Sequence, residues 1–227
     1  MTDISKIVEE IVSNINNIIV GEYDISTMEN TFCDTKWARA GKRIQNTDTS
    51  ELFKITSVQT DEYIEAVPVN AGLFESGSYA LPFPFYISGT RLATNKEWTL
   101  ADKDLTKKTP IIWLLETVEE EHFGRGDSRE FQASMRIFFL DETNIKDFYT
   151  QDHRREVVLP MQKLVDQFIE TINNDARFQT IESFRIKTFS RFGVEQENGM
   201  FQNILDANLS GVELILSLTK FKENCKC

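Results

Sequence analysis

The chain has 227 residues, of which 41% are hydrophobic and 27% charged, and this balance is typical of a soluble globular protein with a sizeable core. The formal net charge of −11 argues against a surface that grips nucleic acid, because neutralising phosphates requires lysine and arginine. Seventeen phenylalanines, against three tryptophans and five tyrosines, predict many rings buried in a core or an interface.

The cysteines and the N-terminus bear on the compartment. Cys33, Cys225 and Cys227 are too few for a disulfide framework, so we expect a reducing environment. These thiols could bind a soft metal, but we favour a frayed terminus with incidental cysteines and predict no metal site and no cofactor. The N-terminal sequence lacks the pattern of a signal peptide, and no apolar run approaches the roughly 18 residues of a spanning helix, so we predict no membrane association.

The clearest helix is expected over residues 3–20, where isoleucine and valine recur at spacings of three and four. Asp3 is the expected N-cap, and Gly21 the expected stop. Because β-branched residues are weak helix formers, packing against the protein's own sheet must hold this helix.

A short basic patch with one aromatic residue follows, made of Trp37, Arg39, Lys42 and Arg43. A nucleic-acid site is one interpretation of this pattern. Four such residues in an acidic chain are weak evidence, so we give that interpretation little weight.

A β-rich stretch is expected next. Residues 52–69 alternate between apolar and polar and predict a β-hairpin that turns at Asp61. Residues 71–86 form an apolar loop that must fold onto the sheet or dock on another molecule. Residues 89–108 are polar, with Trp98 as the largest apolar side chain, and we expect residues 102–108, which carry mixed charges, to form a surface loop.

The centre of the chain carries the strongest pattern. Five successive apolar residues, 111–115, predict a strand buried on both faces of a covered sheet. A charged connection leads to a second strand at 130–140, and residues 157–172 have the spacing of an amphipathic helix. Further strands are expected at 184–194 and 211–221.

These patterns predict an α+β protein. We expect an antiparallel or mixed sheet packed by two main helices, one N-terminal and one over residues 153–174. Residues 1–44 and 110–227 are expected to form the core domain, and residues 45–109 an inserted β-rich region.

The sequence contains no catalytic signature that we recognise from residue spacing. It has no glycine-rich phosphate loop and no Gly-x-Ser-x-Gly elbow. His122 and His153 fall in expected loops, and neither has a second histidine at ligand spacing. We therefore predict that the chain is not an enzyme.

Two carboxylate groups flank the central hairpin, Glu119-Glu120-Glu121 and Asp141-Glu142. They could form an acid–base pair or hold a divalent cation, and a carboxylate-dependent hydrolase would require Glu120 and Asp141 to converge. Carboxylates beside a hairpin more often form a solvated rim, which is the interpretation we favour.

A family resemblance rests on apolar-run and turn motifs. They are the N-terminal amphipathic helix, Pro110-Ile111-Ile112-Trp113-Leu114-Leu115-Glu116, Met135-Arg136-Ile137-Phe138-Phe139-Leu140, Leu159-Pro160-Met161 and Leu209-Ser210-Gly211-Val212-Glu213-Leu214. This set resembles structural proteins of tailed bacteriophages of Bacteroidetes hosts, including the crAss-like phages. The order of elements also resembles tail-terminator, tail-completion and head–tail connector proteins. The likeness covers residues 1–20 and 110–222.

The resemblance implies a structural virion protein that is assembled in the host cytoplasm. Such a protein forms a homo-oligomeric ring of six or twelve subunits at the phage neck or tail. The ring joins head or portal to tail, contacts portal, connector or tail-tube proteins, and lets DNA pass without specific binding.

If the chain is such a ring protein, two sets of residues are candidates for its functional surfaces. The subunit interface is expected at Leu81, Phe83, Phe85 and Tyr86, since a ring needs complementary apolar edges. The channel lining is expected at Glu119, Glu120, Glu121, Asp141 and Glu142, whose charges would repel DNA phosphates. The alternative function is a glycan- or protein-binding β module that stacks its ligand on Phe83, Phe85, Tyr86 and Trp98.

Overall fold

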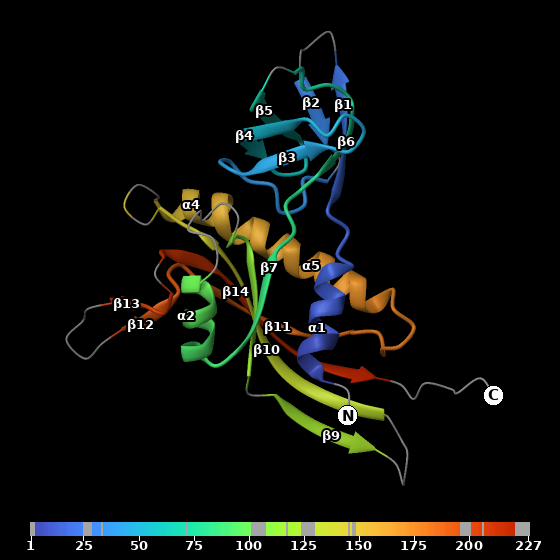
Figure 1. The fold of residues 1–227 in the computed structure, drawn as a ribbon, viewed down its shortest axis with the longest axis vertical. Coiled ribbons are helices and arrows are strands. Elements are labelled where there is room, and N and C mark those ends of the chain that lie inside the picture. The colour runs from blue at the N-terminus through green and yellow to red at the C-terminus, as the bar shows by residue number, and fades with distance from the viewer. Residues whose placement is uncertain are drawn as a thin grey trace.

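A computed structural model describes most of the chain. The described residues are 3–24, 29–32, 34–70, 72–100, 108–116, 118–123, 130–144, 146, 149–195, 201–205 and 207–220. They form a mixed α+β protein with two lobes, a β-barrel at one end and a helix-covered sheet at the other (Figure 1).

The barrel lobe is a closed six-stranded barrel. Its strands are β1 (Ile18–Asp24), β2 (Glu29–Phe32), β3 (Arg43–Asn46), β4 (Leu52–Gln59), β5 (Tyr63–Pro68) and β6 (Gly77–Ala80), in the order β1-β2-β5-β4-β3-β6. Strand β6 pairs with β1, Ile18 opposite Ala80, and so closes the barrel. Aromatic side chains fill the interior, where the ring of Phe74 lies 5.2 Å from that of Phe53 and 4.7 Å from that of Tyr79.

The sheet lobe is built on two long strands, β10 and β14. Its strands are β7 (Phe85–Gly89), β8 (Ile111–Leu115), β9 (Glu119–Phe123), β10 (Glu130–Glu142), β11 (Arg185–Phe189) and β14 (Leu209–Lys220). The order is β11-β14-β10-β8-β7, and β9 also pairs with β10, beyond the end of β8. Neighbouring strands are antiparallel except β7 and β8. A small separate hairpin consists of β12 (Gly193–Glu195) and β13 (Phe201–Asn203).

Helices cover both faces of this sheet. They are α1 (Ile4–Ser13), α2 (Arg91–Leu100), α4 (Thr150–His153), the π-helix η1 (Arg154–Val158) and α5 (Leu159–Asn173). In Figure 1, α5 runs between the barrel and the sheet, with α1 beside it and α2 away from both. Among the described residues, no helix has both the length and the apolar character needed to cross a membrane.

Each face of the sheet has its own core. One cluster of buried side chains joins the barrel interior, α1, α5 and one face of the sheet. A second cluster lies on the other face, where Trp113 and Phe138 pack against Trp98 of α2 and Phe192. The two clusters explain why residues 111–114 are all buried, and the prediction of a strand covered on both faces is confirmed.

The predicted N-terminal helix is too long. The α-helix ends at Ser13, and the next isoleucines belong to β1, because Asn14 leaves the helical conformation and Ile18-Ile19-Val20 is a β-branched run. Asn17 then pairs with Leu81 in both directions, through its side-chain amide at 2.6 Å and its carbonyl at 2.9 Å. Contacts across 64 positions therefore override the local helical spacing.

The polar stretch around Trp98 forms a helix, α2, which the sequence did not predict. The surface loop expected over residues 102–108 lies outside the described residues except for Lys108, which is buried. Trp98 is buried at 2% exposure, and its carbonyl accepts a hydrogen bond of 2.9 Å from the Lys108 ammonium, which also lies over the indole ring. The helix is held on the sheet mainly by one buried aromatic residue. Its sequence therefore lacks the repeated apolar spacing that would have predicted a helix.

The hairpin predicted over residues 52–69 is confirmed as β4 and β5, with Asp61 in the turn between them. The expected domain boundaries need correction. Residue 45 lies within β3, and the barrel already begins at Ile18. Strand β7 pairs with β8, so residues 85–89 belong to the sheet lobe.

Candidate functional site

Two polar clusters lie where the barrel meets the sheet lobe, and we name them by their position. The buried clamp consists of Arg39, Lys42, Thr109 and Asp141. The outer clamp consists of Asp34, Lys36, Asp61 and Lys163. Both connect a barrel-lobe segment to a segment of the sheet lobe that is far away in the sequence.

The buried clamp is centred on Asp141, near the end of β10. Its carboxylate is 1% exposed and accepts from the Lys42 ammonium at 2.8 Å, while Arg39 lies 3.3 Å from its second oxygen. Lys42 also donates to the carbonyl of Thr109 at 2.9 Å and to its hydroxyl, and Arg39 donates to the carbonyl of Glu142 at 2.5 Å. Two cations thus share one buried carboxylate, and Arg39 Nε and Asp141 Oδ2 have no hydrogen-bond partner.

The buried clamp shifts the pKa of both its acid and its base. Burial alone would raise the pKa of Asp141, but the neighbouring cations of Arg39 and Lys42 hold it below its ordinary value. Burial lowers the pKa of Lys42, although Asp141 acts in the opposite direction. The pair is thus an internal ion pair with no open position for a substrate.

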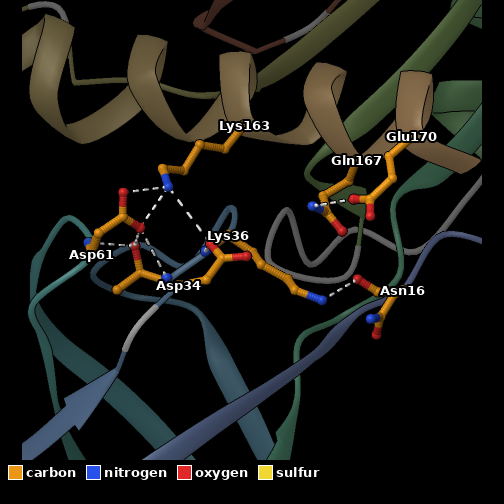
Figure 2. Close-up of polar contacts among 8 residues, drawn as sticks. Asn16, Asp34, Lys36, Asp61, Lys163, Gln167 and Glu170 are labelled. Atoms are coloured by element: carbon orange, nitrogen blue, oxygen red, sulfur yellow. Dashed lines mark hydrogen bonds and ion pairs between the residues drawn. The ribbon is translucent and has the colours of Figure 1, made fainter.

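The outer clamp connects the barrel loops to α5 (Figure 2). The Lys163 ammonium lies 2.5 Å and 2.6 Å from the two carboxylate oxygens of Asp61, and 3.6 Å from a carboxylate oxygen of Asp34. Asp61 also accepts from the backbone N–H of Thr35 at 3.2 Å, and Lys36 donates from its ammonium to the carbonyl of Asn16 at 2.8 Å. This network fixes the orientation of two barrel loops on the helix.

Backbone geometry supports a structural role for the outer clamp. Lys36 and Asp61 both have positive φ, 46° and 58°, which is uncommon for residues other than glycine. The carboxylate of Asp34 stabilises the first of these by accepting from the N–H of Lys36 at 2.8 Å. Burial acts to raise the pKa of Asp61, but the hydrogen bond from Lys163 outweighs it and lowers the pKa below its ordinary value. This carboxylate therefore stays ionised.

A buried histidine and a buried serine lie within hydrogen-bond distance of each other in the sheet lobe, and the sequence did not predict this contact. His153 lies in α4, not in the expected loop, and its Nε2 is 2.9 Å from the Ser210 hydroxyl and 2.6 Å from that of Thr143. Ser210 donates its only proton to the carbonyl of Ser190 at 2.6 Å, so this proton is not directed at Nε2, and the roles of the Ser210 and Thr143 hydroxyls at Nε2 depend on the tautomer of His153. A catalytic base would need Nε2 unprotonated toward the serine, and Ser210 is fully buried. The pair is structural.

A pocket of about 520 Å³ lies between the start of α1 and the connection from β8 to β9. Ser5 and Ser88 meet on its wall with their hydroxyl oxygens 2.6 Å apart, and Tyr86 donates to the carbonyl of Ser5 at 2.9 Å. Glu116 and Glu120 also line it. These groups provide neither an activated nucleophile nor a positioned base.

The expected subunit interface needs correction. Leu81 is 2% exposed and packs in the barrel core, so it is not available to another molecule. Phe85 and Tyr86 lie in β7 and are half-buried. Of the four predicted residues, Phe83 is well exposed, at 55%.

The expected channel lining is also partly wrong. Asp141 is buried and ion-paired within the buried clamp, and Glu142 is half-buried beside it. Glu119, Glu120 and Glu121 are exposed on β9. A hydrolase site built from Glu120 and Asp141 is excluded, since Glu120 pairs with Ala133 of β10, and Asp141 lies eight positions further along that strand, about 27 Å away.

Other predicted sites are explained by the fold. The stacking surface of the alternative function does not form, because Trp98 is buried and the Tyr86 hydroxyl is bonded to Ser5. In the basic patch, Trp37 and Lys42 are buried, and Arg39 faces Asp141. The three cysteines lie outside the described residues. Within the described ranges, no three histidine, cysteine or acidic side chains gather as a metal site would require.

Comparisons with protein-family models, with curated proteins and with solved structures returned no match.

Proposed function

We propose that this chain is a structural virion protein that acts by assembly, forming a homo-oligomeric ring at a phage neck or tail through which DNA passes. The sequence motifs that resemble tailed-phage proteins lie in α1, β8, β10, α5 and β14, which build the sheet lobe. We therefore assign the proposed structural role to the sheet lobe and regard the barrel as an added part.

The observation that carries the proposal is how the polar groups at the lobe junction are used. The buried clamp and the outer clamp bind one lobe to the other, and the carboxylates of Asp141 and Asp61 are each paired with a cation across this junction. The described His–Ser pair is likewise committed to internal hydrogen bonds. Rigid geometry of this kind serves a subunit whose neighbours must meet it in one orientation.

A second observation points the same way. Strands β9 and β11 each pair on one side, with β10 and β14 respectively, among the residues that the structure describes. Unpaired strand edges can accept another strand, and soluble proteins usually cover or shorten them. An assembling subunit has a reason to keep them open.

The direct test is cryo-electron microscopy of purified virions of the phage that encodes this chain. The expected result is density for the two-lobed fold in a closed ring around the DNA path at the neck or tail. Mass spectrometry of the same particles, as a control, measures how many copies of the chain each particle contains. Particles that lack the chain would overturn the proposal.

A further inference from the structure

A pocket of about 450 Å³ lies between the C-terminal ends of α1 and α5, away from both clamps. Its volume is within the range of small-molecule sites. The wall includes four side-chain amides, one carboxylate and one hydroxyl, which belong to Asn14, Asn16, Asn174, Gln167, Glu170 and Thr171. We call it the amide pocket.

The two helix ends hold these side chains in place. Asn14 and Asn174 cap the C-terminal ends of α1 and α5, and the backbone N–H of each donates to the carbonyl four residues earlier, at 3.2 Å and 2.9 Å. Gln167, Thr171 and Asn174 follow each other at intervals of four and three residues, so one face of α5 presents them together. A ligand therefore meets a wall built on regular helices.

The α5 side of the pocket offers a donor and acceptors side by side. Gln167 donates from Nε2 to Glu170 Oε2 at 3.1 Å, and Figure 2 shows the two side chains extending together from the helix. This bond leaves the Gln167 amide oxygen, one of its N–H groups and the second Glu170 oxygen open. Thr171 donates its proton to the carbonyl of Gln167 at 2.7 Å, so its hydroxyl oxygen can only accept.

The α1 side supplies mainly donors. The amide oxygen of Asn16 accepts from the backbone N–H of Ile18 at 3.1 Å, and this leaves the NH₂ group of Asn16 open. Within the part of the chain that the structure describes, the side chains of Asn14 and Asn174 make no hydrogen bond. The pocket thus combines open donors and open acceptors.

The charges around the amide pocket are balanced. Asp175, at its edge, is paired with Arg177 at 2.6 Å. The Lys36 ammonium donates to the carbonyl of Asn16 at 2.8 Å. Burial lowers the pKa of Lys36, and the negative charge of Glu170 is one of those that act in the opposite direction, so these two side chains interact. This balance favours a neutral ligand over a phosphate or a free cation.

The open groups also select among neutral ligands. A hydroxyl both donates and accepts, so neighbouring hydroxyls of a sugar ring match the open groups of Gln167 and Glu170. Bound peptides usually use a sheet edge, an apolar groove, aromatic residues or an arginine cluster. The described residues that line the amide pocket provide none of these.

We propose that the amide pocket binds a neutral saccharide. The amides of Asn16, Asn174 and Gln167 hold its hydroxyls, Glu170 is the main acceptor, and the apolar wall at Ile11 faces the C–H groups of the ring. This activity goes beyond assembly, since a single subunit carries the whole pocket.

Nuclear magnetic resonance tests the proposal, because side-chain NH₂ groups give their own signals in an amide proton–nitrogen correlation spectrum. The labelled full chain is titrated with the methyl glycosides of glucose, galactose, mannose and N-acetylglucosamine, and with maltose and lactose. At least one of these should shift the signals of Asn16, Asn174 and Gln167 with a Kd below about 10 mM. Methylammonium chloride and sodium phosphate should not. The inference is overturned if no sugar shifts these signals or if the shifts lie elsewhere.

Two substitutions locate the site. Gln167→Ala removes the paired amide, whereas Asn16→Asp keeps the oxygen that accepts from Ile18 and loses the NH₂ group. Each should raise the Kd at least about fivefold. The matched control is Gln151→Ala, which removes an exposed helical amide outside the pocket and should leave the Kd unchanged. Unaltered binding by both pocket variants would overturn the inference.

A neutral peptide separates the two classes of ligand. N-acetylglycylglycine amide carries donors and acceptors but no sugar ring, and it should bind more weakly than the best sugar. Equal or tighter binding of this peptide at the pocket would overturn the saccharide assignment. Sugar binding by a chain that is absent from virions would overturn the proposed function alone, whereas a virion ring whose subunit binds no sugar would overturn this inference alone.

Discussion

The barrel lobe and the sheet lobe differ in how their outermost strands are paired. In the barrel, β6 pairs with β1, so the sheet has no edge. In the sheet lobe, β9 and β11 each pair on one side among the described residues. A closed barrel offers no strand edge for pairing, whereas an edge strand of the sheet lobe can pair with another strand through its main chain.

The largest effect is expected from the residue that binds the two lobes together. Replacing Asp141→Asn leaves the buried cations of Lys42 and Arg39 without a counter-charge, so the free energy of unfolding should fall by about 3–5 kcal/mol. Urea denaturation measures the loss. A fall below about 1 kcal/mol would contradict the described role of the buried clamp.

A pair of glycines compares the tolerance of the two lobes. In the sheet lobe, a Cβ on Gly211 would lie 2.0 Å from the carbonyl oxygen of Phe139, and the φ of +152° also disfavours a side chain. Because a backbone atom in the middle of β10 has little freedom to move, Gly211→Ala should cost about 3 kcal/mol. Thermal and urea unfolding measure the cost.

The matched substitution in the barrel is Gly21→Ala. Its Cβ would lie 2.6 Å from the ring of Phe32, a side chain that can turn. We expect a smaller cost, about 1–2 kcal/mol, measured in the same way. Equal losses at the two glycines would show that the barrel interior is as rigid as the central strands.

A pH effect is expected at the end of the sheet lobe. Burial, and then the nearby cation of Arg39, lower the pKa of His153 below its ordinary 6.5. The unfolded chain therefore binds this proton at a higher pH than the folded chain, and stability should decrease as the pH falls from about 7.5 to about 5.5. His153→Gln should flatten this decrease in urea unfolding. An unchanged slope would mean that His153 is not its source.

The smallest effect is expected at the outer clamp. Lys163 is 25% exposed and Asp61 43%, so solvent screens their ion pair. Lys163→Gln should lower the free energy of unfolding by about 0.5 kcal/mol, measured by urea denaturation. A loss as large as that of Asp141→Asn would show that both clamps contribute equally to holding the lobes together.

The parts of the fold that the sequence predicted well are those fixed by local patterns. The hairpin at residues 52–69 combines alternation with turn residues, and residues 111–115 form a run that fits a covered strand. In contrast, Ile15, Ile18 and Ile19 continue a helical spacing although the chain has already changed direction there. The hydrogen bonds between Asn17 and Leu81 decide that region, and no local window contains both.

The candidate sites were predicted less well for the same reason. Asp141 looked like a solvated carboxylate beside a hairpin, and Arg39 and Lys42 looked like a basic patch. Each has an unremarkable neighbourhood in the sequence, and the pairing across about a hundred positions turns them into one buried cluster.

The chain enters the barrel after Asn17 and leaves it at Leu81, and these two residues are hydrogen-bonded to each other. Exchange of the barrel for another module during evolution would therefore require little change in the path of the surrounding chain. Such an exchange has one constraint, because Asp141 belongs to the sheet lobe and would remain, whereas its partners Arg39 and Lys42 belong to the barrel lobe and would be lost. A lineage that exchanges this barrel should either acquire two replacement cations or substitute the aspartate in the same step.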